Sequence, residues 1–236
     1  MASNPPGKCC TLSSFHEGTS KGKHVPFCGL ETYVTGEDSD RTVVILTDIY
    51  GSKYNNVLLV ADEIAKCGYK VYIPDILKGD PVDGSVSLDK WLPNHTNEIT
   101  KPIVDDFLAA FRKEVNPKFL GVIGYCFGAK YAIQQISASG HADAAAVAHP
   151  SFVSIEEVAE IKKPIIISAA EEDSIFPPEL RHQTEAKLAE IGARYQIDLF
   201  SGVSHGFAVR GDISNPVVKY AKEKALADQL QFFALF

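Results

Sequence analysis

The amino-acid sequence predicts a single α/β domain in which helices flank a mostly parallel central sheet. Short apolar runs typical of strands alternate with amphipathic stretches of helical length from about residue 43 to the C-terminus. Strands such as Ile165-Ile166-Ile167 are continuously apolar, as expected for strands buried on both faces. The 236 residues, of which 45% are hydrophobic, are enough to build one large core.

Local signals define the elements in order. A helix over 56–67 places its apolar residues on one face, and Gly68 follows as a C-terminal stop. A strand over 70–73 ends at Pro74, and the long segment 75–97, which contains several glycines and prolines, predicts a functional loop. The other predicted elements are strands over 43–47, 119–123, 143–148, 164–169 and 194–200, and helices over 98–115, 129–136, 155–161, 179–191 and 216–233.

The first forty residues carry weaker signals. Residues 30–35 predict an antiparallel strand at the edge of the sheet. We therefore expect an N-terminal extension or edge segment over residues 1–30 and the α/β domain over residues 31–236.

Charge and hydropathy restrict the partners. The net charge of −7 and the pI of about 5.5 argue against nucleic acid or an acidic membrane surface. No apolar run approaches the length that spans a bilayer, and the first eight residues lack the apolar core of a secretory signal. We expect a cytoplasmic protein that acts on a small molecule. The sequence does not distinguish a monomer from a homodimer.

The five cysteines, at positions 9, 10, 28, 67 and 126, are odd in number and lack metal-ligand spacing. We expect neither a disulfide framework nor a zinc site, and no organic cofactor. The adjacent pair Cys9-Cys10 is open to palmitoylation or redox chemistry, but simple tolerance near a polar terminus is the favoured interpretation.

The most informative motif is Gly124-Tyr125-Cys126-Phe127-Gly128, which lies between a predicted strand and a predicted helix. This is the pattern of the strained strand-to-helix turn that presents the nucleophile in α/β-hydrolases, here with cysteine in place of serine. Side chains two residues to either side would collide with the adjoining strand and helix, so glycine is required there. We expect the Cys126 sulfur to be exposed at the apex, where the N-terminus of the following helix favours a thiolate.

Polar residues also follow three other strands, and reactive groups in open α/β sheets gather at the carboxyl ends of strands. Asp48 follows the strand over 43–47, Asp173 follows the strand over 164–169, and His205 follows the strand over 194–200. The order nucleophile, acid, histidine is that of the α/β-hydrolases. Glu171 and Glu172 stand beside Asp173 as alternative acids, and Asp173 itself is also a plausible helix cap.

These segments resemble the dienelactone hydrolase family of α/β-hydrolases, in its eukaryotic branch. The resemblance extends from about Tyr33 to the C-terminus. It rests on the glycine-flanked Cys126 motif, Asp48-Ile49-Tyr50-Gly51, Pro74-Asp75, Asp173 with Pro177, and His205-Gly206-Phe207-Ala208.

The resemblance implies that Cys126 is the nucleophile, His205 the base and Asp173 the acid that orients it. It implies an oxyanion site formed by the backbone N–H groups of Phe127 and Ile49. The implied activity is hydrolysis of a small activated ester or lactone, of the carboxymethylenebutenolidase type, through a thioacyl intermediate. The alternatives are a catalytically silent protein that binds a ligand or partner in the same pocket, and a protein whose Cys126 responds to oxidants.

Two positions depart from the bacterial pattern of this family. Bacterial members carry glutamate at the position of Asp48, where it holds the cysteine proton. The shorter aspartate puts that gating in doubt, and Asp48 is equally suited to bonding its own loop. Lys78 replaces an arginine that binds the substrate carboxylate, and Arg210 is a second candidate for this anion. Either cation is equally plausible as a plain surface charge.

Three further residues are candidates for the substrate pocket. His149 is predicted to form part of its wall, although it is also a rival base. Trp91 is predicted either to cover the site or to pack half-buried in the long loop. Tyr50 is predicted to shape the pocket, with core packing as the alternative.

Overall fold

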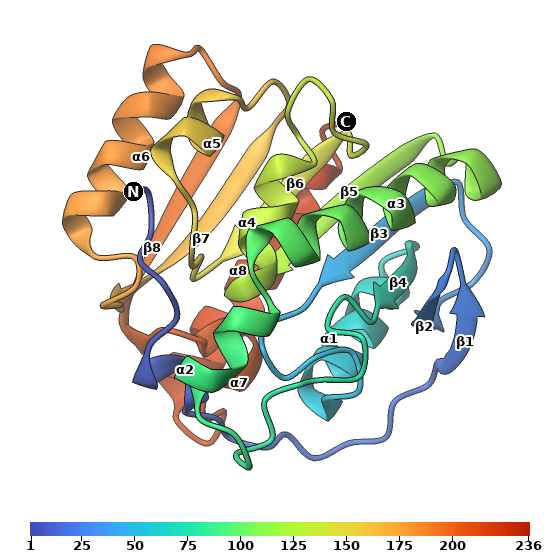
Figure 1. Ribbon diagram of the computed structural model, residues 1–236, viewed down its shortest axis with the longest axis horizontal. Coiled ribbons are helices and arrows are strands. Elements are labelled where there is room, and N and C mark those ends of the chain that lie inside the picture. The colour runs from blue at the N-terminus through green and yellow to red at the C-terminus, as the bar shows by residue number, and fades with distance from the viewer.

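The computed structural model describes residues 1–236, apart from the side chain of Lys8. Its centre is one sheet of eight strands in the order β1-β2-β4-β3-β5-β6-β7-β8 (Figure 1). Strands β3 to β8 are parallel to one another, and β2 pairs antiparallel with both β1 and β4. The strands are β1 (Lys23–Phe27), β2 (Leu30–Thr35), β3 (Arg41–Leu46), β4 (Lys70–Pro74), β5 (Phe119–Tyr125), β6 (Ala144–Ala148), β7 (Ile165–Glu172) and β8 (Tyr195–Ser204).

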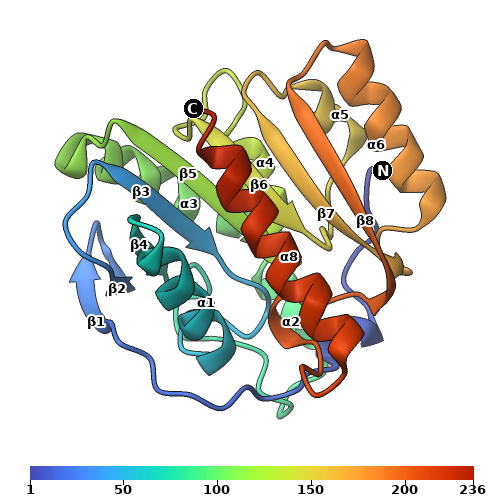
Figure 2. The ribbon, with the colours of Figure 1, turned by 180° about the vertical axis from the view of Figure 1, so that it is seen from behind.

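Helices cover both faces of this sheet. One face carries α3 (Asn97–Val115), α4 (Phe127–Gln134), α5 (Ile155–Ala159) and α6 (Pro178–Glu190). The opposite face carries α1 (Asn55–Lys66) and α8 (Pro216–Phe233), as Figure 2 shows. The shorter helices are α2 (Leu88–Trp91), α7 (Phe207–Arg210), and the 3₁₀ turns η1 (Lys8–Thr11) and η2 (Leu92–Asn94).

Alternating side chains of the central strands supply the core on both faces. In β3, Val44 and Leu46 belong to the cluster beneath α3 and α4, whereas Val43 and Ile45 belong to the cluster beneath α1 and α8. All four side chains have no exposed surface. The predicted α/β architecture with a mostly parallel sheet is therefore confirmed.

Three local expectations need correction. The strand over 30–35 is antiparallel, but β1 and not β2 forms the edge of the sheet. Strand β1 lacks an apolar pattern because it is only partly buried, and its Pro26 is of the kind tolerated at an edge. The long loop contains the short helix α2, and α7 follows β8, where we predicted no helix. Helices of four residues leave too short a pattern to detect.

The first fourteen residues, which we call the N-terminal strap, pack on the carboxyl ends of the parallel strands. The backbone N–H groups of Ala2 and Ser3 donate to the carbonyl of Val153, and that of Asn4 donates to Ile175. The strap then forms η1, from which the chain continues along the rim of the molecule to β1 (Figures 1 and 2). The strap thereby reaches the edge of the sheet where the candidate site residues gather.

Candidate active site

The sharp turn between β5 and α4 places Cys126 at the start of a helix. Its backbone has φ 50° and ψ −107°, a strained conformation for a residue with a side chain. A Cβ atom on Gly128 would lie 2.1 Å from the Leu46 carbonyl oxygen, and one on Gly124 would lie 2.6 Å from the Cα of Ala129. The predicted steric need for glycine at both positions is therefore confirmed.

The sulfur of Cys126 begins a row of polar groups from three strand ends. Nε2 of His205, directly after β8, lies 3.2 Å from Cys126 Sγ. Nδ1 of the same ring lies 3.0 and 2.9 Å from the two carboxylate oxygens of Asp173, directly after β7. A proton on Nδ1 therefore donates to Asp173 and leaves Nε2 to face the sulfur.

Backbone N–H groups fix the Asp173 carboxylate in the site, whereas Glu171 and Glu172 lie outside the site. Its Oδ1 also accepts hydrogen bonds from the backbone N–H groups of Ile175 and Phe176, at 2.8 and 3.0 Å. Glu171 and Glu172 are exposed and bond to Gly202 and Ser204 instead. Asp173 does not cap α6, because Pro177 occupies that position.

The electrostatics favour an ion pair between cysteine and histidine. Burial opposes ionisation of Cys126, but hydrogen bonding from Cys10 and the charge of His205 outweigh it, so the pKa of the thiol falls well below its ordinary value. Burial likewise opposes the charge of His205, yet the Cys126 thiolate and Asp173 raise the pKa of the imidazole. Both shifts favour a thiolate on Cys126 facing an imidazolium on His205.

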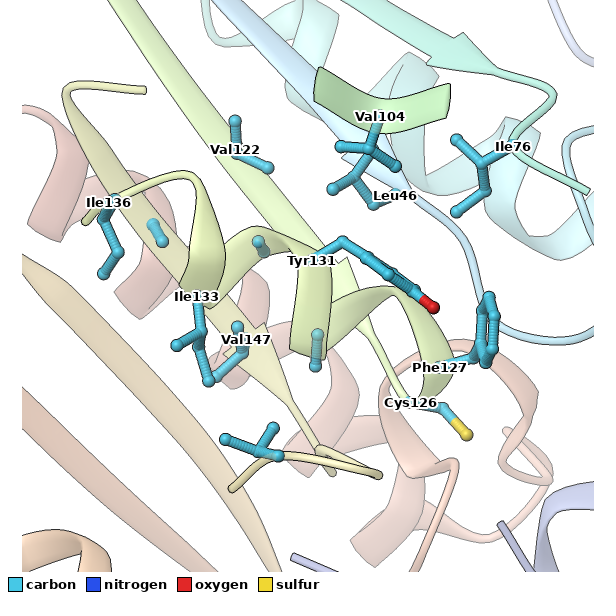
Figure 3. Close-up of a cluster of buried hydrophobic side chains, with 14 of the residues drawn as sticks. Leu46, Ile76, Val104, Val122, Cys126, Phe127, Tyr131, Ile133, Ile136 and Val147 are labelled. Carbon is cyan, nitrogen blue, oxygen red and sulfur yellow. The ribbon is translucent and has the colours of Figure 1, made fainter. Parts of the chain in front are cut away.

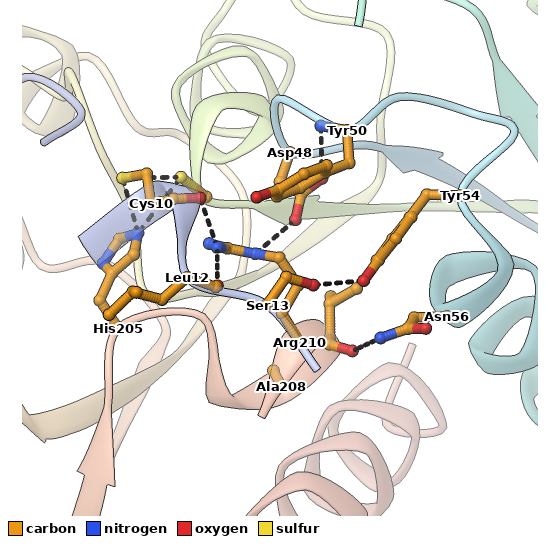
Figure 4. A network of polar contacts seen from close by, with 12 residues as sticks. Cys10, Leu12, Ser13, Asp48, Tyr50, Tyr54, Asn56, His205, Ala208 and Arg210 are labelled. Carbon is orange, nitrogen blue, oxygen red and sulfur yellow. Dashed lines mark hydrogen bonds and ion pairs between the residues drawn. The ribbon is translucent and has the colours of Figure 1, made fainter. Parts of the chain in front are cut away.

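The sulfur is covered, contrary to our expectation that it would be exposed. Cys126 has no exposed surface, because the strap lies over it. Cys10 Sγ lies 3.6 Å from Cys126 Sγ and 3.4 Å from His205 Nε2 (Figure 4). The sequence did not predict that Cys10 would lie in the site. Cys9 is only partly buried, and its Sγ lies 3.8 Å from Ser174 Oγ.

Side chains from the domain hold the strap in place. Arg210 Nη1 donates to the carbonyl oxygens of Cys10 and Leu12, the second at 2.8 Å. Tyr50 donates its hydroxyl to the carbonyl of Thr11 at 2.8 Å, and Ser13 Oγ bonds to the hydroxyl of Tyr54. Tyr50 thus contacts the cover of the site, and Figure 4 shows the bonds made by Arg210 and Ser13.

Arg210 and Asp48 form a buried ion pair beside the sulfur. Arg210 Nε lies 2.8 Å from Asp48 Oδ2, and the two side chains are 1% and 3% exposed. The plain surface-charge interpretation of Arg210 is therefore wrong. Asp48 Oδ1 accepts from the backbone N–H of Tyr50 at 3.0 Å, so Asp48 also bonds its own loop. The polar contacts of Asp48 with described residues go to Arg210 and Tyr50, and none goes to the Cys126 thiol.

This ion pair gives a prediction about stability. Arg210→Met leaves the Asp48 carboxylate buried without a cation, so we expect it to lower the free energy of unfolding by about 3–5 kcal/mol. The double variant Asp48→Asn/Arg210→Met removes both charges and should recover part of that loss. Urea unfolding of the wild type, Asp48→Asn, Arg210→Met and the double variant measures both effects. A double variant as unstable as the sum of the two single variants would contradict the pairing.

The other residues predicted for the pocket are His149, Trp91 and Lys78. The ring centroid of His149 lies 5.0 Å from that of His205, and His149 is fully buried. Burial lowers its pKa to about 4, which argues against the rival-base interpretation. Trp91 is buried rather than half-buried: it stacks on His95 at 3.7 Å and contacts Phe127 edge-on. Lys78 is exposed, and its side chain has no ion pair with any described residue.

The predicted oxyanion groups flank the turn. Phe127 is the first residue of α4 and is buried beside Cys126 at the end of the apolar cluster beneath α3 and α4 (Figure 3). Ile49 is buried on the loop after β3. Within the described residues, no carbonyl or side chain accepts from the backbone N–H of either residue. Both donors are therefore available to a ligand.

Cys10, Cys126 and His205 also bring two sulfurs and one ring nitrogen within 4.8 Å of one another. These three donor atoms are the set in the described part of the chain that is close enough to bind a soft metal ion. The contact of His205 with Asp173, and the contacts among the two sulfurs and the ring, equally suit thiol chemistry without a metal.

Comparison with known proteins assigns the family. The model of the dienelactone hydrolase family matches residues 30–236. The chain belongs to this family. Fungal members similar to it are the hydrolase pyvD of Aspergillus violaceofuscus, 37% identical with 99% of this chain and 98% of the relative covered, and the hydrolase tropI of Talaromyces stipitatus, 38% identical with 99% and 97% covered.

Solved structures agree with the fold of the dienelactone hydrolase family. A putative dienelactone hydrolase from Klebsiella pneumoniae superposes with a TM-score of 0.76 at 14% identity, covering 92% of this chain and 99% of its own. The match to the family model confirms the family resemblance predicted from the sequence. Across the described part of the chain, none of the helices combines the length and apolarity needed to cross a membrane.

Proposed function

We propose that this member of the dienelactone hydrolase family cleaves a small activated ester or lactone through a thioacyl intermediate on Cys126. The observation that carries the proposal is the row from Cys126 Sγ through His205 to Asp173, with contacts of 3.2 and 2.9 Å. A preformed thiolate attacks the carbonyl carbon, and the carbonyl oxygen gains negative charge as the tetrahedral intermediate forms. The backbone N–H groups of Ile49 and Phe127 are the donors for this oxygen.

His205 transfers a proton twice, once as the leaving group departs and once as water attacks the thioester. Its Nε2 proton passes to the oxygen of the departing alcohol or enol, which leaves the acyl group on sulfur. The neutral ring then takes a proton from water, and the resulting hydroxide attacks the thioester and releases the acid. Asp173 stabilises the imidazolium and fixes the orientation of the ring throughout.

The sulfur nucleophile limits the class of substrate. A thiolate leaves a tetrahedral intermediate more readily than an alkoxide does, so an alkyl ester returns to reactants. An enolate is stabilised by conjugation and competes as a leaving group, which favours enol esters and unsaturated lactones. Arg210 is the better candidate to attract an anionic group on the substrate. Its Nη2 has no hydrogen-bond partner within the described residues, whereas Lys78 makes no contact with the site.

Substrate entry requires the strap to move. The sulfur has no exposed surface while Cys10 lies against it, and a carbonyl carbon must come within bonding distance. The strap is held by hydrogen bonds from Arg210 and Tyr50 and not by a covalent link. We infer that it opens during turnover, as lids do in many enzymes.

A panel of esters and lactones tests the substrate class. We expect kcat/KM for an enol ester or a five-membered unsaturated lactone to exceed that for an alkyl ester of the same acid by at least about 100-fold. The Cys126→Ala protein provides the background rate. Equal rates on alkyl and enol esters would argue against a thiolate mechanism.

Substitution tests whether Asp173, and not a neighbouring glutamate, is the acid that supports His205. Asp173→Asn removes the charge that stabilises imidazolium, and we expect kcat/KM to fall by about 10²–10⁴-fold. The control is Glu171→Gln, an exposed acid two residues away, which should leave the rate unchanged. Steady-state kinetics on the preferred ester measures both. Similar losses in the two variants would remove Asp173 from the proposed row.

A further inference from the structure

Cys10 is a second buried thiol against Cys126, and the proposed hydrolysis gives it no chemical step. The two sulfurs lie 3.6 Å apart, although the residues are 116 positions apart in the sequence. A disulfide bond is about 2 Å long, so a small movement of the strap brings the atoms to bonding distance. Among the described residues, the sulfur of Cys10 is the one that contacts Cys126.

The surroundings favour chemistry between these two thiols. His205 Nε2 contacts both, at 3.2 Å from Cys126 and 3.4 Å from Cys10. The imidazolium and the start of α4 favour the thiolate on Cys126. Hydrogen bonding with Cys126 raises the pKa of Cys10, which favours a protonated Cys10 beside the Cys126 sulfur. Cys126 is thus the activated thiolate, and Cys10 is a protonated thiol beside it.

A surface cleft lies next to the histidine that contacts the pair. A surface cleft of about 470 Å³ is lined by Cys9, Leu12, His205 and Arg210, among others. His205 is one of the lining residues, and its ring contacts both sulfurs. Both sulfurs are fully buried, so an oxidant in this cleft reaches them when the strap moves.

We propose that Cys10 and Cys126 form a reversible disulfide when a hydroperoxide oxidises Cys126, so that Cys10 acts as the resolving thiol. The Cys126 thiolate attacks one peroxide oxygen, which forms an S–O bond and breaks the O–O bond. The sulfur is oxidised to sulfenic acid, and hydrogen peroxide is reduced to water after one proton is added. Cys10 then attacks that sulfur. The S–S bond forms, the S–O bond breaks, and the leaving hydroxide takes the Cys10 proton to give a second water.

The disulfide would have two consequences for the enzyme. It ties the strap to the turn that carries Cys126, so the site cannot open and hydrolysis stops. It also consumes the sulfenic acid before a second peroxide converts it to sulfinic acid, which thiols do not reduce. This regulation rests on the proposed function only for its effect on hydrolysis, because the disulfide needs no ester substrate.

Cys9 is the competing partner and the matched control. Hydrogen bonding from Cys10 lowers the pKa of Cys9 to about 6, so Cys9 is also a reactive thiol. Its Sγ contacts Ser174 Oγ and not Cys126. Geometry therefore predicts that Cys10, and not Cys9, links to Cys126.

The test treats the full-length protein with one equivalent of hydrogen peroxide in the presence of a chelator. Free thiols are then blocked with iodoacetamide, and a non-reducing digest is analysed by mass spectrometry. We expect a peptide containing Cys10 linked to the peptide containing Cys126. Because Cys9 and Cys10 share a peptide, the same link must appear in Cys9→Ser and disappear in Cys10→Ser.

Recovery after reduction provides the second readout. Dithiothreitol should restore the starting rate of ester hydrolysis in the wild type and in Cys9→Ser, each normalised to its untreated sample. This readout uses an excess of hydrogen peroxide, because sulfinic acid consumes two peroxide molecules per thiol. The recovered rate of Cys10→Ser should then be about tenfold lower, with sulfinic acid on Cys126. A link to Cys9, sulfinic acid on Cys126 of the wild type without a link, or full recovery of Cys10→Ser would overturn the proposal. A link that forms in a protein without esterase or lactonase activity would refute only the proposed hydrolysis.

Discussion

Cys126→Ala should abolish turnover of activated esters without unfolding the protein. The substitution removes the proposed nucleophile, so we expect kcat/KM to fall by about 10⁴-fold or more. The burst of leaving group that accompanies the first acylation should vanish with it. Stopped-flow release of a coloured enol, followed over the first turnover, measures both.

The fold should tolerate this change, because alanine fits the turn and Gly124 and Gly128 remain. We therefore expect the midpoint of thermal unfolding to stay within a few degrees of the wild type. Cys67→Ala is the matched control, since Cys67 is an exposed cysteine at the end of α1. Its rate and burst should equal those of the wild type. Turnover that survives in Cys126→Ala would end the covalent mechanism.

His205→Ala should change the shape of the pH profile as well as its height. In the wild type the pKa of Cys126 is lowered and that of His205 is raised. The thiolate therefore forms as pH rises through a value well below the ordinary cysteine pKa, and kcat/KM rises with it. Activity is lost again when His205 gives up its proton at a pH above its ordinary value. The profile should be level across neutral pH.

Removal of the imidazolium takes away the charge that favours the thiolate. In His205→Ala the residual kcat/KM should rise through neutral pH and level off only above about pH 8.5, the ordinary value for cysteine. The rate at neutral pH should fall by at least about 10³-fold. His182→Ala, at an exposed histidine of α6, is the control and should keep the level profile. A level profile in His205→Ala would contradict the assignment.

The parts of the site that were predictable are those fixed by short-range rules. The glycine-flanked pattern around Cys126 lies within five residues, so it can be recognised locally, even though the Leu46 carbonyl that requires Gly128 belongs to β3. His205 and Asp173 were found because each directly follows a parallel strand, and such strands end at one edge of the sheet. The mostly parallel sheet was predictable because its strands are continuously apolar, as strands buried on both faces are.

The parts that were missed depend on contacts between distant segments. Cys10 lies on the sulfur of Cys126 because the strap docks on Val153, Ile175 and Arg210, and no pattern near residue 10 encodes that docking. Arg210 resembled a surface charge because its partner, Asp48, is 162 positions away and the pairing appears only in the folded chain. Strand β1 was missed because an edge strand need not be apolar.

The most direct test of the account is the identity of the residue that carries the acyl group. The wild-type protein is mixed with an enol ester, quenched in acid within the first turnover, and digested for mass spectrometry. We predict an added acyl mass on the peptide that contains Cys126, released by hydroxylamine as expected for a thioester and absent from Cys126→Ala. An acyl group on any other residue would contradict the central claim that this sulfur is the nucleophile.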